Sequence, residues 1–263
     1  MHDIVAALGA PWVLAVLLLT VRIAALLLLT PVLHAVPVPL TVRLLLVIAL
    51  ACVVAMPFGA AQTPQAADAG DLLQAVLREA AIGATLGLGV LMAFAGFSLA
   101  GRLVDVQIGF GIAQVLDPLT RSQVPVLSAA FGLLAAVFFF LIDGHHALLR
   151  GIAYSVERFP VGRGAAPAAA AEPLLRGMAA LFTLGFALAA PIVLGLLLVE
   201  FALGVVSRNL PQMNMLVMGI PVKVIAGLLA LSVWAAGFGA PARRLYAGIY
   251  QAWNGWFSAQ GPR

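Results

Sequence analysis

Charged residues are scarce in this chain, and their scarcity argues against a free soluble domain. Only 9% of the 263 residues are charged, whereas 63% are hydrophobic. In soluble domains about a quarter of the residues are charged, so a water-exposed surface of this size could not be covered by so few. The excess apolar surface needs lipid, or a large assembly of partner helices, as its environment.

Cysteine and lysine are rarer still. Cys52 is the one cysteine, which excludes an intramolecular disulfide and a cysteine metal cluster. The net charge of +4 comes from scattered arginines and a single lysine, Lys223. No basic stripe with interleaved aromatic residues accompanies them, so nucleic acid is not an expected partner. Basic residues that flank apolar segments are instead typical of membrane proteins.

The sequence also lacks recognisable reaction chemistry. It contains no nucleophile–base pair, carboxylate dyad or metal-ligand cluster, so we predict no enzymatic activity, no cofactor and no metal site. His145 and His146 beside Asp143 come closest to a metal motif. Adjacent helical residues point about 100° apart, which suits a shared ion poorly. Asp143, before Gly144, is expected to cap the start of the next helix.

Long apolar stretches are what the chain does have, and they predict an all-α membrane protein with about six long helices. A helix of about 20 apolar residues crosses lipid, and helix is favoured over strand because backbone polar groups must be satisfied within the segment. The second stretch is marginal in length, and the first is longer than a signal-peptide core and is expected to be retained. The stretches are residues 11–33, 44–61, 81–100, 124–142, 178–206 and 213–240.

The longest interruption between apolar stretches is residues 143–173. It contains the low-complexity alanine tract 165–171, which predicts a flexible link between two halves of the chain. We therefore predict a helical part at 1–164, an alanine-rich linker at 165–173, and a helical hairpin with a C-terminal tail at 174–263.

Two ionisable residues, Arg22 and Glu200, lie inside long apolar runs. A charge at the centre of a membrane helix costs about 2.5–3.5 kcal/mol on insertion scales, so such residues usually face a bundle interior or a wet cavity. One interpretation is a proton or ion relay. The other is an ion pair between helices, or a charge that reaches towards water. Two isolated charges make a poor relay, so packing or assembly is favoured.

Residues 101–125 form a glycine-rich, semi-polar segment between two strongly apolar stretches. Irregular backbone at membrane depth is tolerated where protein buries it or where it lines a cavity. The segment could therefore be a constriction, a re-entrant loop or a plug, and an ordinary surface loop is the alternative.

Residues 207–223 form the second informative segment. Pro211 and Pro221 are expected to bracket a turn between two long helices, which makes a helical hairpin. The side chains of Gln212 and Asn214 can bond to freed backbone groups or to partner chains.

At these residues the chain resembles the FliR (SctT) family of export-gate proteins, which comprises flagellar FliR and its injectisome relatives. The resemblance spans nearly the whole length, and the order and spacing of its fragments make it specific. The fragments are Thr30-Pro31-Val32-Leu33, Val36-Pro37, Val42-Arg43, Gly109-Phe110-Gly111, Asp117-Pro118, Pro125-Val126-Leu127, Asp143-Gly144-His145-His146, Phe159-Pro160-Val161-Gly162, Leu203-Gly204, Arg208, Pro211-Gln212-Met213-Asn214 and Gly219-Ile220-Pro221.

The resemblance implies a structural subunit of the flagellar type III protein export gate. Such a subunit has a FliP-like part followed by a FliQ-like hairpin. It assembles with FliP and FliQ homologues, beside FlhB- and FlhA-type components, and unfolded substrate proteins pass through the assembly. The implied location is the bacterial inner membrane, as a multi-pass protein in the flagellar basal body.

The resemblance also implies roles for particular residues. Part of the 101–125 segment, chiefly 108–123, is expected to project into the pore as a plug, and the glycines Gly83, Gly87 and Gly89 are expected to allow close helix approach. The expected plug residues are Ile108, Gly109, Phe110, Gly111, Asp117, Pro118 and Gln123. The expected hairpin and assembly residues are Arg208, Pro211, Gln212, Asn214, Pro221 and Lys223.

Two alternatives remain open at this point. The 143–146 and 159–162 fragments look flagellar, whereas Lys223 and Glu200-Phe201 are also compatible with the equivalent subunit of an injectisome. A stand-alone secondary transporter would have broken helices at corresponding positions of two similar halves, and the halves of this chain do not look like repeats.

Overall fold

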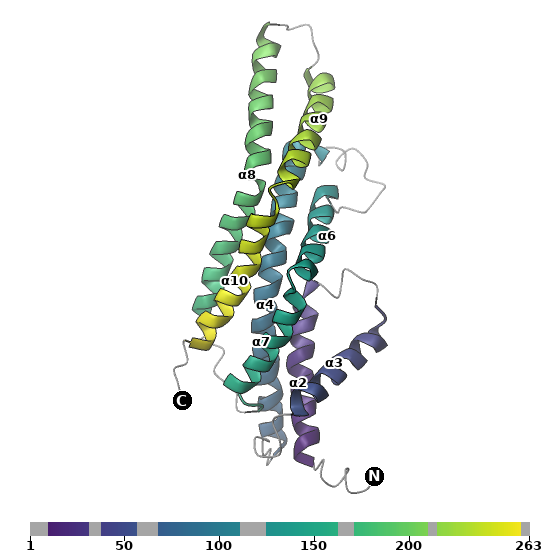
Figure 1. Ribbon diagram of the computed structural model, residues 1–263, viewed down its shortest axis with the longest axis vertical. Helices are drawn as coiled ribbons and strands as arrows, with labels where there is room; N and C mark the ends of the chain where they lie inside the picture. The colour runs from purple at the N-terminus through teal and green to yellow at the C-terminus, as the bar shows by residue number, and fades with distance from the viewer. Residues whose placement is uncertain are drawn as a thin grey trace. The chain divides into compact units, whose positions relative to one another are not determined.

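The computed structural model describes residues 10–31, 38–56, 68–110, 125–162, 171–209 and 215–258. Within these ranges the chain forms eight α-helices and no strand, which confirms the all-α prediction (Figure 1). The helices are α2 (Ala10–Leu29), α3 (Leu40–Ala55), α4 (Ala69–Ile108), α6 (Val126–Leu141), α7 (Gly144–Arg158), α8 (Ala171–Asn209), α9 (Met215–Ala235) and α10 (Gly239–Ser258).

Each of the six predicted apolar stretches falls on a helix. Four of these helices, α2, α4, α8 and α9, are long and apolar enough to cross a membrane, and the number is five if α6 and α7 count as one broken span. The stretch of marginal length, residues 44–61, corresponds to α3. Its 16 residues extend about 24 Å at the helical rise, which is less than the hydrocarbon thickness of about 30 Å.

Three helices differ from the sequence-based expectations. The 40 residues of α4 continue through residues 101–108, so the prediction of irregular backbone there is wrong for this part, and residues 111–124 lie outside the described ranges. Within the predicted interruption, α7 forms a helix, and α10 occupies most of the predicted C-terminal tail. The alanine tract lies mostly outside the described ranges, and α8 begins at Ala171, so the predicted division of the chain stays a prediction.

The chain divides into two compact units. Unit 1 comprises Met1–Met92, Asp143–Met178 and Gly248–Arg263, and unit 2 comprises Ala93–Ile142 and Ala179–Ala247. Three boundaries fall inside α4, α8 and α10, so each of these helices contributes to both units, and the fourth falls between α6 and α7.

In unit 1, Trp253 of α10 packs where two glycines leave room for its ring. A Cβ at Gly89 of α4 would lie 2.8 Å from the indole nitrogen, and a Cβ at Gly151 of α7 would overlap the other edge of the ring. The indole N–H donates a hydrogen bond to the carbonyl oxygen of Leu86 at 3.2 Å. A large aromatic side chain is thus buried with its polar atom satisfied, and it joins α10 to α4 and α7.

Two further glycines of α4, Gly83 and Gly87, let this helix pack close to α2. A Cβ at Gly83 would overlap the carbonyl oxygen of Arg22, and a Cβ at Gly87 would lie 2.8 Å from that of Leu26. Small residues at such a crossing let two membrane helices pack backbone to backbone. The expectation that Gly83, Gly87 and Gly89 permit close approach is therefore confirmed.

Unit 2 has an aromatic core. The ring of Tyr246 in α10 lies 5.5–5.9 Å from the rings of Phe94, Phe97 and Phe139, and its hydroxyl donates to the carbonyl oxygen of Ala135 at 2.6 Å. Aromatic pairs at these separations add attraction beyond their buried area. The core therefore fixes α10 against α4 and α6 within this unit.

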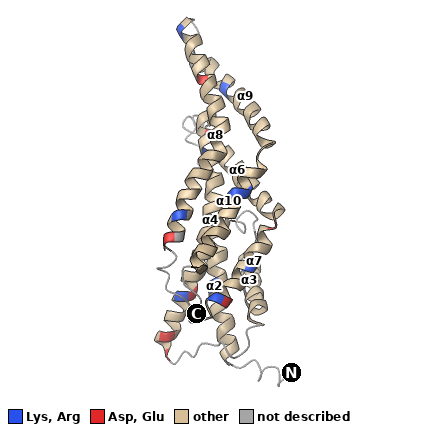
Figure 2. Ribbon diagram, turned by 60° about the vertical axis from the view of Figure 1, so that its left-hand side comes forward, with Lys and Arg blue, Asp and Glu red and all other residues tan. Residues whose placement is uncertain are grey.

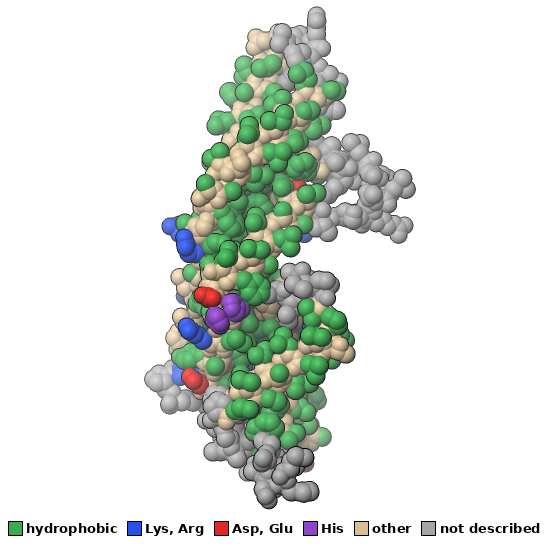
Figure 3. Space-filling view, turned by 45° about the vertical axis from the view of Figure 1, so that its right-hand side comes forward, with side chains coloured by type: hydrophobic (Ala, Val, Ile, Leu, Met, Phe, Trp, Pro, Cys, Tyr) green, Lys and Arg blue, Asp and Glu red, His purple; other side chains and the backbone are tan. Residues whose placement is uncertain are grey.

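The surface of the chain is mostly apolar. Hydrophobic side chains are spread over the described part of the face shown in Figure 3, and the few charged residues are scattered along the helices in Figure 2. Large exposed hydrophobic residues are concentrated on α3, α6, α8 and α9. A surface of this kind requires a non-aqueous environment.

Replacing Gly83 by alanine tests the close approach of α2 and α4. The new methyl group would overlap the Arg22 carbonyl and lie 3.0 Å from the Cβ of Ala25, so the helices must separate, at a cost of about 1–3 kcal/mol. We expect a lower thermal unfolding midpoint in detergent. Gly248→Ala in α10 is the matched control, because nothing lies within 4 Å of its added Cβ. Equal midpoints for the two variants would contradict the close approach.

Candidate functional site

Arg22 of α2 and Glu79 of α4 form an ion pair inside unit 1. Arg22 Nε donates to Glu79 Oε2 at 2.6 Å, and one terminal guanidinium nitrogen, Nη2, donates to Oε1 at 3.1 Å. The side chains are 1% and 0% exposed. Such two-pronged contacts between guanidinium and carboxylate are strong and directional, so the pair ties α2 to α4 at the glycine-lined crossing.

The remaining polar groups of this cluster come from α7 and the residues that follow it. Arg22 also donates to the hydroxyl of Ser155 at 3.2 Å and to the carbonyl oxygen of Phe159 at 2.9 Å, and the amide of Gly162 donates to Glu79 at 2.8 Å. Gly162 has a φ of 73°, a conformation that glycine adopts without strain. The fragment Phe159-Pro160-Val161-Gly162 thus binds both members of the ion pair through its backbone. A cluster so enclosed suits a structural role rather than an ion relay.

Glu200 of α8 is the centre of a second cluster, in unit 2. Its carboxylate forms an ion pair with Lys223 of α9 through Oε1, and its Oε2 accepts a hydrogen bond from the side-chain amide of Gln107 in α4 at 3.1 Å. The side chains of Glu200 and Lys223 are 39% and 21% exposed, more than those of the cluster in unit 1. Arg22 and Glu200 therefore each have a partner of their own.

The predicted plug segment begins directly after Gln107. Ile108 is fully buried, and Gly109 has a φ of 99° and donates its amide to the carbonyl oxygen of Asp105 at 3.2 Å. A glycine with positive φ and this hydrogen bond is a common helix terminator, so the chain leaves α4 at Gly109. Phe110 is partly buried. The other predicted plug residues, Gly111, Asp117, Pro118 and Gln123, lie outside the described ranges.

The start of α6 contacts the end of α4. Oδ1 of Asp105 accepts from the backbone amide of Leu127 at 3.5 Å, and a Cβ at Gly101 would lie 2.7 Å from the Cα of Ser128. The last turns of α4 and the first turn of α6 are therefore in contact. Asp105 is 2% exposed, and the hydrogen bond to Leu127 satisfies one of its two oxygens.

The structure places two further hairpin residues and corrects one expectation. Arg208 is exposed in the last turn of α8, where a cation suits the negative end of the helix dipole. Pro221 lies inside α9, so it does not bracket the turn; membrane helices tolerate an internal proline because neighbouring groups satisfy the freed carbonyl. Pro211, Gln212 and Asn214 lie outside the described ranges.

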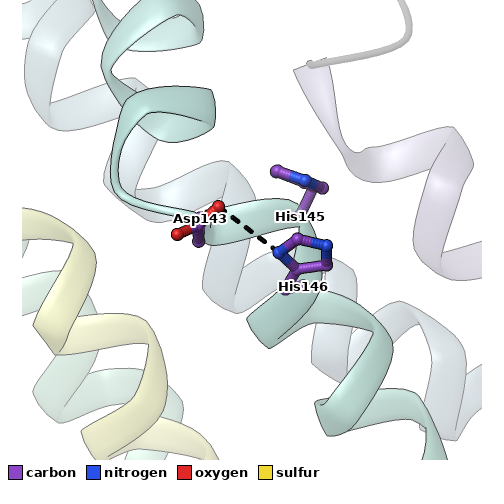
Figure 4. A group of neighbouring side chains, drawn as sticks. All are labelled: Asp143, His145 and His146. Carbon is purple, nitrogen blue, oxygen red and sulfur yellow. Dashed lines mark ion pairs between the residues drawn. The ribbon is translucent and has the colours of Figure 1, made fainter.

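Asp143, His145 and His146 lie at the start of α7 (Figure 4). Asp143 has a φ of 57°, and its side chain makes no capping hydrogen bond; its carboxylate instead lies 3.3 Å from Nδ1 of His146. The imidazole rings are 4.1 Å apart, and ligand atoms of all three residues lie within 4.8 Å of one another. Asp143 therefore holds the expected N-cap position of α7, although its side chain makes no capping hydrogen bond, and the expectation of diverging histidines is wrong.

This group could offer three ligand atoms to one cation, yet its setting opposes that role. It lies at the N-terminus of α7, where the positive end of the helix dipole disfavours a cation. The Asp143 carboxylate already has His146 as its partner. A role in fixing the start of α7 fits the group better.

Sequence analysis missed the residues that complete both clusters. Glu79 comes just before an apolar stretch and looks like a charge that flanks it, and Gln107 falls in the segment that was expected to be irregular. One signal could have found Glu79. It shares one helix face with Gly83 and Gly87 at intervals of four residues, and that face is the one that contacts α2.

The fold and these two clusters define a multi-pass, helical membrane protein in which Arg22 pairs with Glu79, and Glu200 with Lys223, between helices. Residues 13–248 match the family described as bacterial export proteins, family 1, and the chain belongs to this family. The resemblance to FliR noted in the sequence is thereby confirmed. The family is one of export proteins and not of enzymes.

Several relatives carry more specific names. The chain is 37% identical over 160 residues to the flagellar biosynthetic protein FliR of Bacillus subtilis, covering 59% of this chain and 61% of that protein. It is 28% identical over 207 residues to FliR of Escherichia coli, covering 79% and 78%. It is also 28% identical over 166 residues to the Yop proteins translocation protein T of Yersinia pestis, covering 62% and 63%. The chain thus spans about three fifths of the Bacillus subtilis relative.

Neutralising Arg22 and Glu79 one at a time and together tests the buried pair. Arg22→Met or Glu79→Met alone leaves an uncompensated buried charge, which costs about 3–5 kcal/mol, whereas removing both charges is often far less damaging. We expect both single variants to unfold at lower temperature in detergent than the double variant does. Additive losses in the double variant would show that the two charges do not interact.

Proposed function

We propose that this chain is a structural core subunit of a flagellar type III protein export gate. It acts with FliP and FliQ homologues, beside FlhB- and FlhA-type components, to form the channel through which unfolded export substrates pass. Its place is the bacterial inner membrane, in the flagellar basal body. It catalyses no reaction; it acts by forming part of the channel wall and by obstructing the channel.

The match to a family of export proteins over residues 13–248 carries this proposal, and the apolar surface supports it. The exposed hydrophobic residues of α8 and α9 form one broad apolar face on each helix, which lipid or partner helices can cover. On α8 they include Phe182, Phe186, Leu194, Leu198, Phe201 and Val205, and on α9 Val217, Met218, Ile225, Leu228, Leu229 and Val233.

The equivalent subunit of an injectisome is the second candidate, favoured by the similarity to the Yersinia pestis protein. The flagellar assignment is preferred because the Bacillus subtilis FliR shares 37% identity over a stretch of similar length, against 28% for the Yersinia pestis protein. A stand-alone secondary transporter has less support. The charged residues of both clusters are already paired within this chain, Arg22 with Glu79 and Glu200 with Lys223, so they are not available to bind a solute.

Within the gate we propose two roles for residues named above. The segment that begins at Ile108 and Gly109 projects into the pore as a plug, with Phe110, Gly111, Asp117, Pro118 and Gln123 in it. The hairpin residues Arg208, Pro211, Gln212, Asn214, Pro221 and Lys223 serve assembly. The glycine-terminated end of α4 supports the first role, since it directs the chain out of the helix at that point.

Co-expression with flagellar FliP and FliQ homologues tests the proposed assembly. We expect this chain to co-purify with them in detergent as one complex, because its apolar surface then has the partners that it needs. A parallel co-expression with the injectisome homologues separates the two candidates, since preferential recovery with that set would favour the injectisome. Recovery of this chain as a lone monomer in both experiments would contradict the proposal.

Deleting residues 111–123 from the assembled gate tests the plug. If the segment obstructs the pore, the deletion should raise the resting leak of small ions through purified gates in lipid vesicles. The control is the wild-type gate purified in the same preparation and shown to contain the same subunits. A leak unchanged by the deletion would refute the plug assignment.

A further inference from the structure

We propose that the outer surface of α7 and of residues 248–258 of α10 lines a water-filled passage at membrane depth. This inference rests on the proposed function for the identity of the passage, which is the export channel. It adds which part of this chain meets the water of the channel and the polypeptide that passes through it. This surface, the polar face, comprises the exposed polar residues His146, Arg150, Glu157, Gln251, Asn254 and Ser258.

The two helices that carry the polar face pack together within unit 1. Nε of Arg158 in α7 donates to the carbonyl oxygen of Phe257 in α10 at 3.1 Å, and the rings of Tyr154 and Phe257 lie 5.1 Å apart. The ring of Trp253 in α10 fits against Gly151 of α7. The outer surfaces of α7 and of this part of α10 therefore adjoin.

Each of these helices buries an apolar side and exposes a more polar one. The inward residues of α10 are large, apolar and at most 5% exposed, namely Ile249, Trp253, Trp256 and Phe257. All the exposed residues among 248–258 are polar. On α7, Leu149 and Tyr154 are exposed beside the polar residues. A helix sorted in this way faces the protein core on one side and water on the other.

The depth of the polar face follows from α4. Glu79 and Arg102 enclose residues 80–101, an uncharged run with the length of about 20 residues that crosses the hydrocarbon core of a membrane. Trp253 donates to the carbonyl oxygen of Leu86 and contacts Gly89. These two residues come six and nine positions after Ala80, which is about 9–14 Å along the helix. Trp253 therefore lies well inside the membrane segment of α4.

Polar residues of the polar face are close neighbours of this contact. Arg150 precedes Gly151, Gln251 and Asn254 are near Trp253 in the sequence, and all three polar side chains are exposed. Lipid tails offer them no hydrogen bonds, and polar residues at such depth usually face a water-filled cavity or polar protein groups. The amide side chains are too short to reach the lipid headgroups from there. Lipid is therefore an unsuitable environment for the polar face.

Two other environments fit less well than a water-filled passage. An amphipathic helix can lie on a membrane with its apolar side in lipid, but the apolar side of α7 is already packed against protein, with Ile152 and Val156 1% and 0% exposed. A partner helix would have to bring counter-charges to Arg150 and Glu157, which have no ion-pair partner among the described residues. Water satisfies all of these groups at once.

The chemistry of the polar face suits the passage of an unfolded polypeptide. Arg150 and Glu157 carry charges of opposite sign, and the amides and the hydroxyl between α7 and the end of α10 are neutral. A passing chain therefore meets neither a field of one sign nor a wide apolar surface. Weak contacts of this kind let a substrate enter and leave.

Thiol labelling in the gate assembled with FliP and FliQ homologues in lipid vesicles tests the polar face. In a Cys52→Ala background, Gln251→Cys or Asn254→Cys should react with a charged, membrane-impermeant thiol reagent about tenfold or more faster than Leu28→Cys, because a thiol reacts as its thiolate, which water stabilises. Leu28 of α2 is the matched control. It is 75% exposed, and its neighbours Leu26 and Leu29 contact Gly87, so it lies at a similar depth.

A stalled substrate tests whether the water belongs to the channel. A flagellar export substrate fused to a stably folded domain should stop in the gate and protect both thiols, so that labelling falls in proportion to the fraction of gates occupied. Thiols that react equally well with and without the stalled substrate would show that the polar face lies in water outside the channel, and this would overturn the proposal.

The remaining outcomes separate the polar face from the proposed function. If both variants co-purify with FliP and FliQ homologues but react no faster than Leu28→Cys, the polar face is not in water, and the export-gate assignment stands. If the wild-type chain does not assemble with these homologues, the assignment fails and the passage fails with it.

Discussion

The ion pair between Arg22 and Glu79 determines how the helices of unit 1 can pack. Either charge alone would be untenable where almost no solvent reaches, so α2 and α4 must meet at this point, and the glycines of α4 let their backbones approach closely enough. Ser155, Phe159 and Gly162 then supply the hydroxyl, carbonyl and amide that the pair still requires. The position of α7 and of the turn after it follows from that requirement, because a buried polar group without a partner is costly. One buried pair therefore constrains three helices at once.

Periodic and compositional signals predicted the helices of this protein well, and they failed where partners far along the chain decide the structure. Six apolar stretches are enough to find α2, α3, α4, α6, α8 and α9. The sequence did not predict the full length of α4, because the polar residues towards its two ends look like the boundaries of an apolar segment. In the structure these residues lie within the helix, where Glu79 binds Arg22 and Gln107 binds Glu200. The mixed composition of α7 and α10 likewise reads as loop or tail. The helix α10 forms because its Trp253 and Tyr246 find buried sites on other helices, and α7 packs against Trp253 through Gly151.

The same reasoning applies to the residues singled out in advance. Arg22 and Glu200 were identified as unusual because a charge within an apolar run is costly, and the interpretation as packing or assembly agrees with the partners that each has. Their partners were beyond reach of a sequence argument, since intervals of 57, 23 and 93 residues separate the paired positions along the chain and no local periodicity records them. Pro221 shows the opposite error, in which a local rule about proline was applied to a membrane helix that can absorb it.

The two charged clusters differ in a way that suits different tasks. Arg22 and Glu79 are closed off from solvent and bound by five hydrogen bonds between them and their surroundings, so separating them would leave charges with no substitute partner; such a cluster serves a part of the protein that does not rearrange. Glu200 and Lys223 retain some exposure, and their link to α4 is a single neutral amide. Breaking that link strands no charge. The first cluster therefore keeps the helices of unit 1 together, whereas the second joins the end of α4 to the α8–α9 hairpin in unit 2 through a hydrogen bond that water can replace.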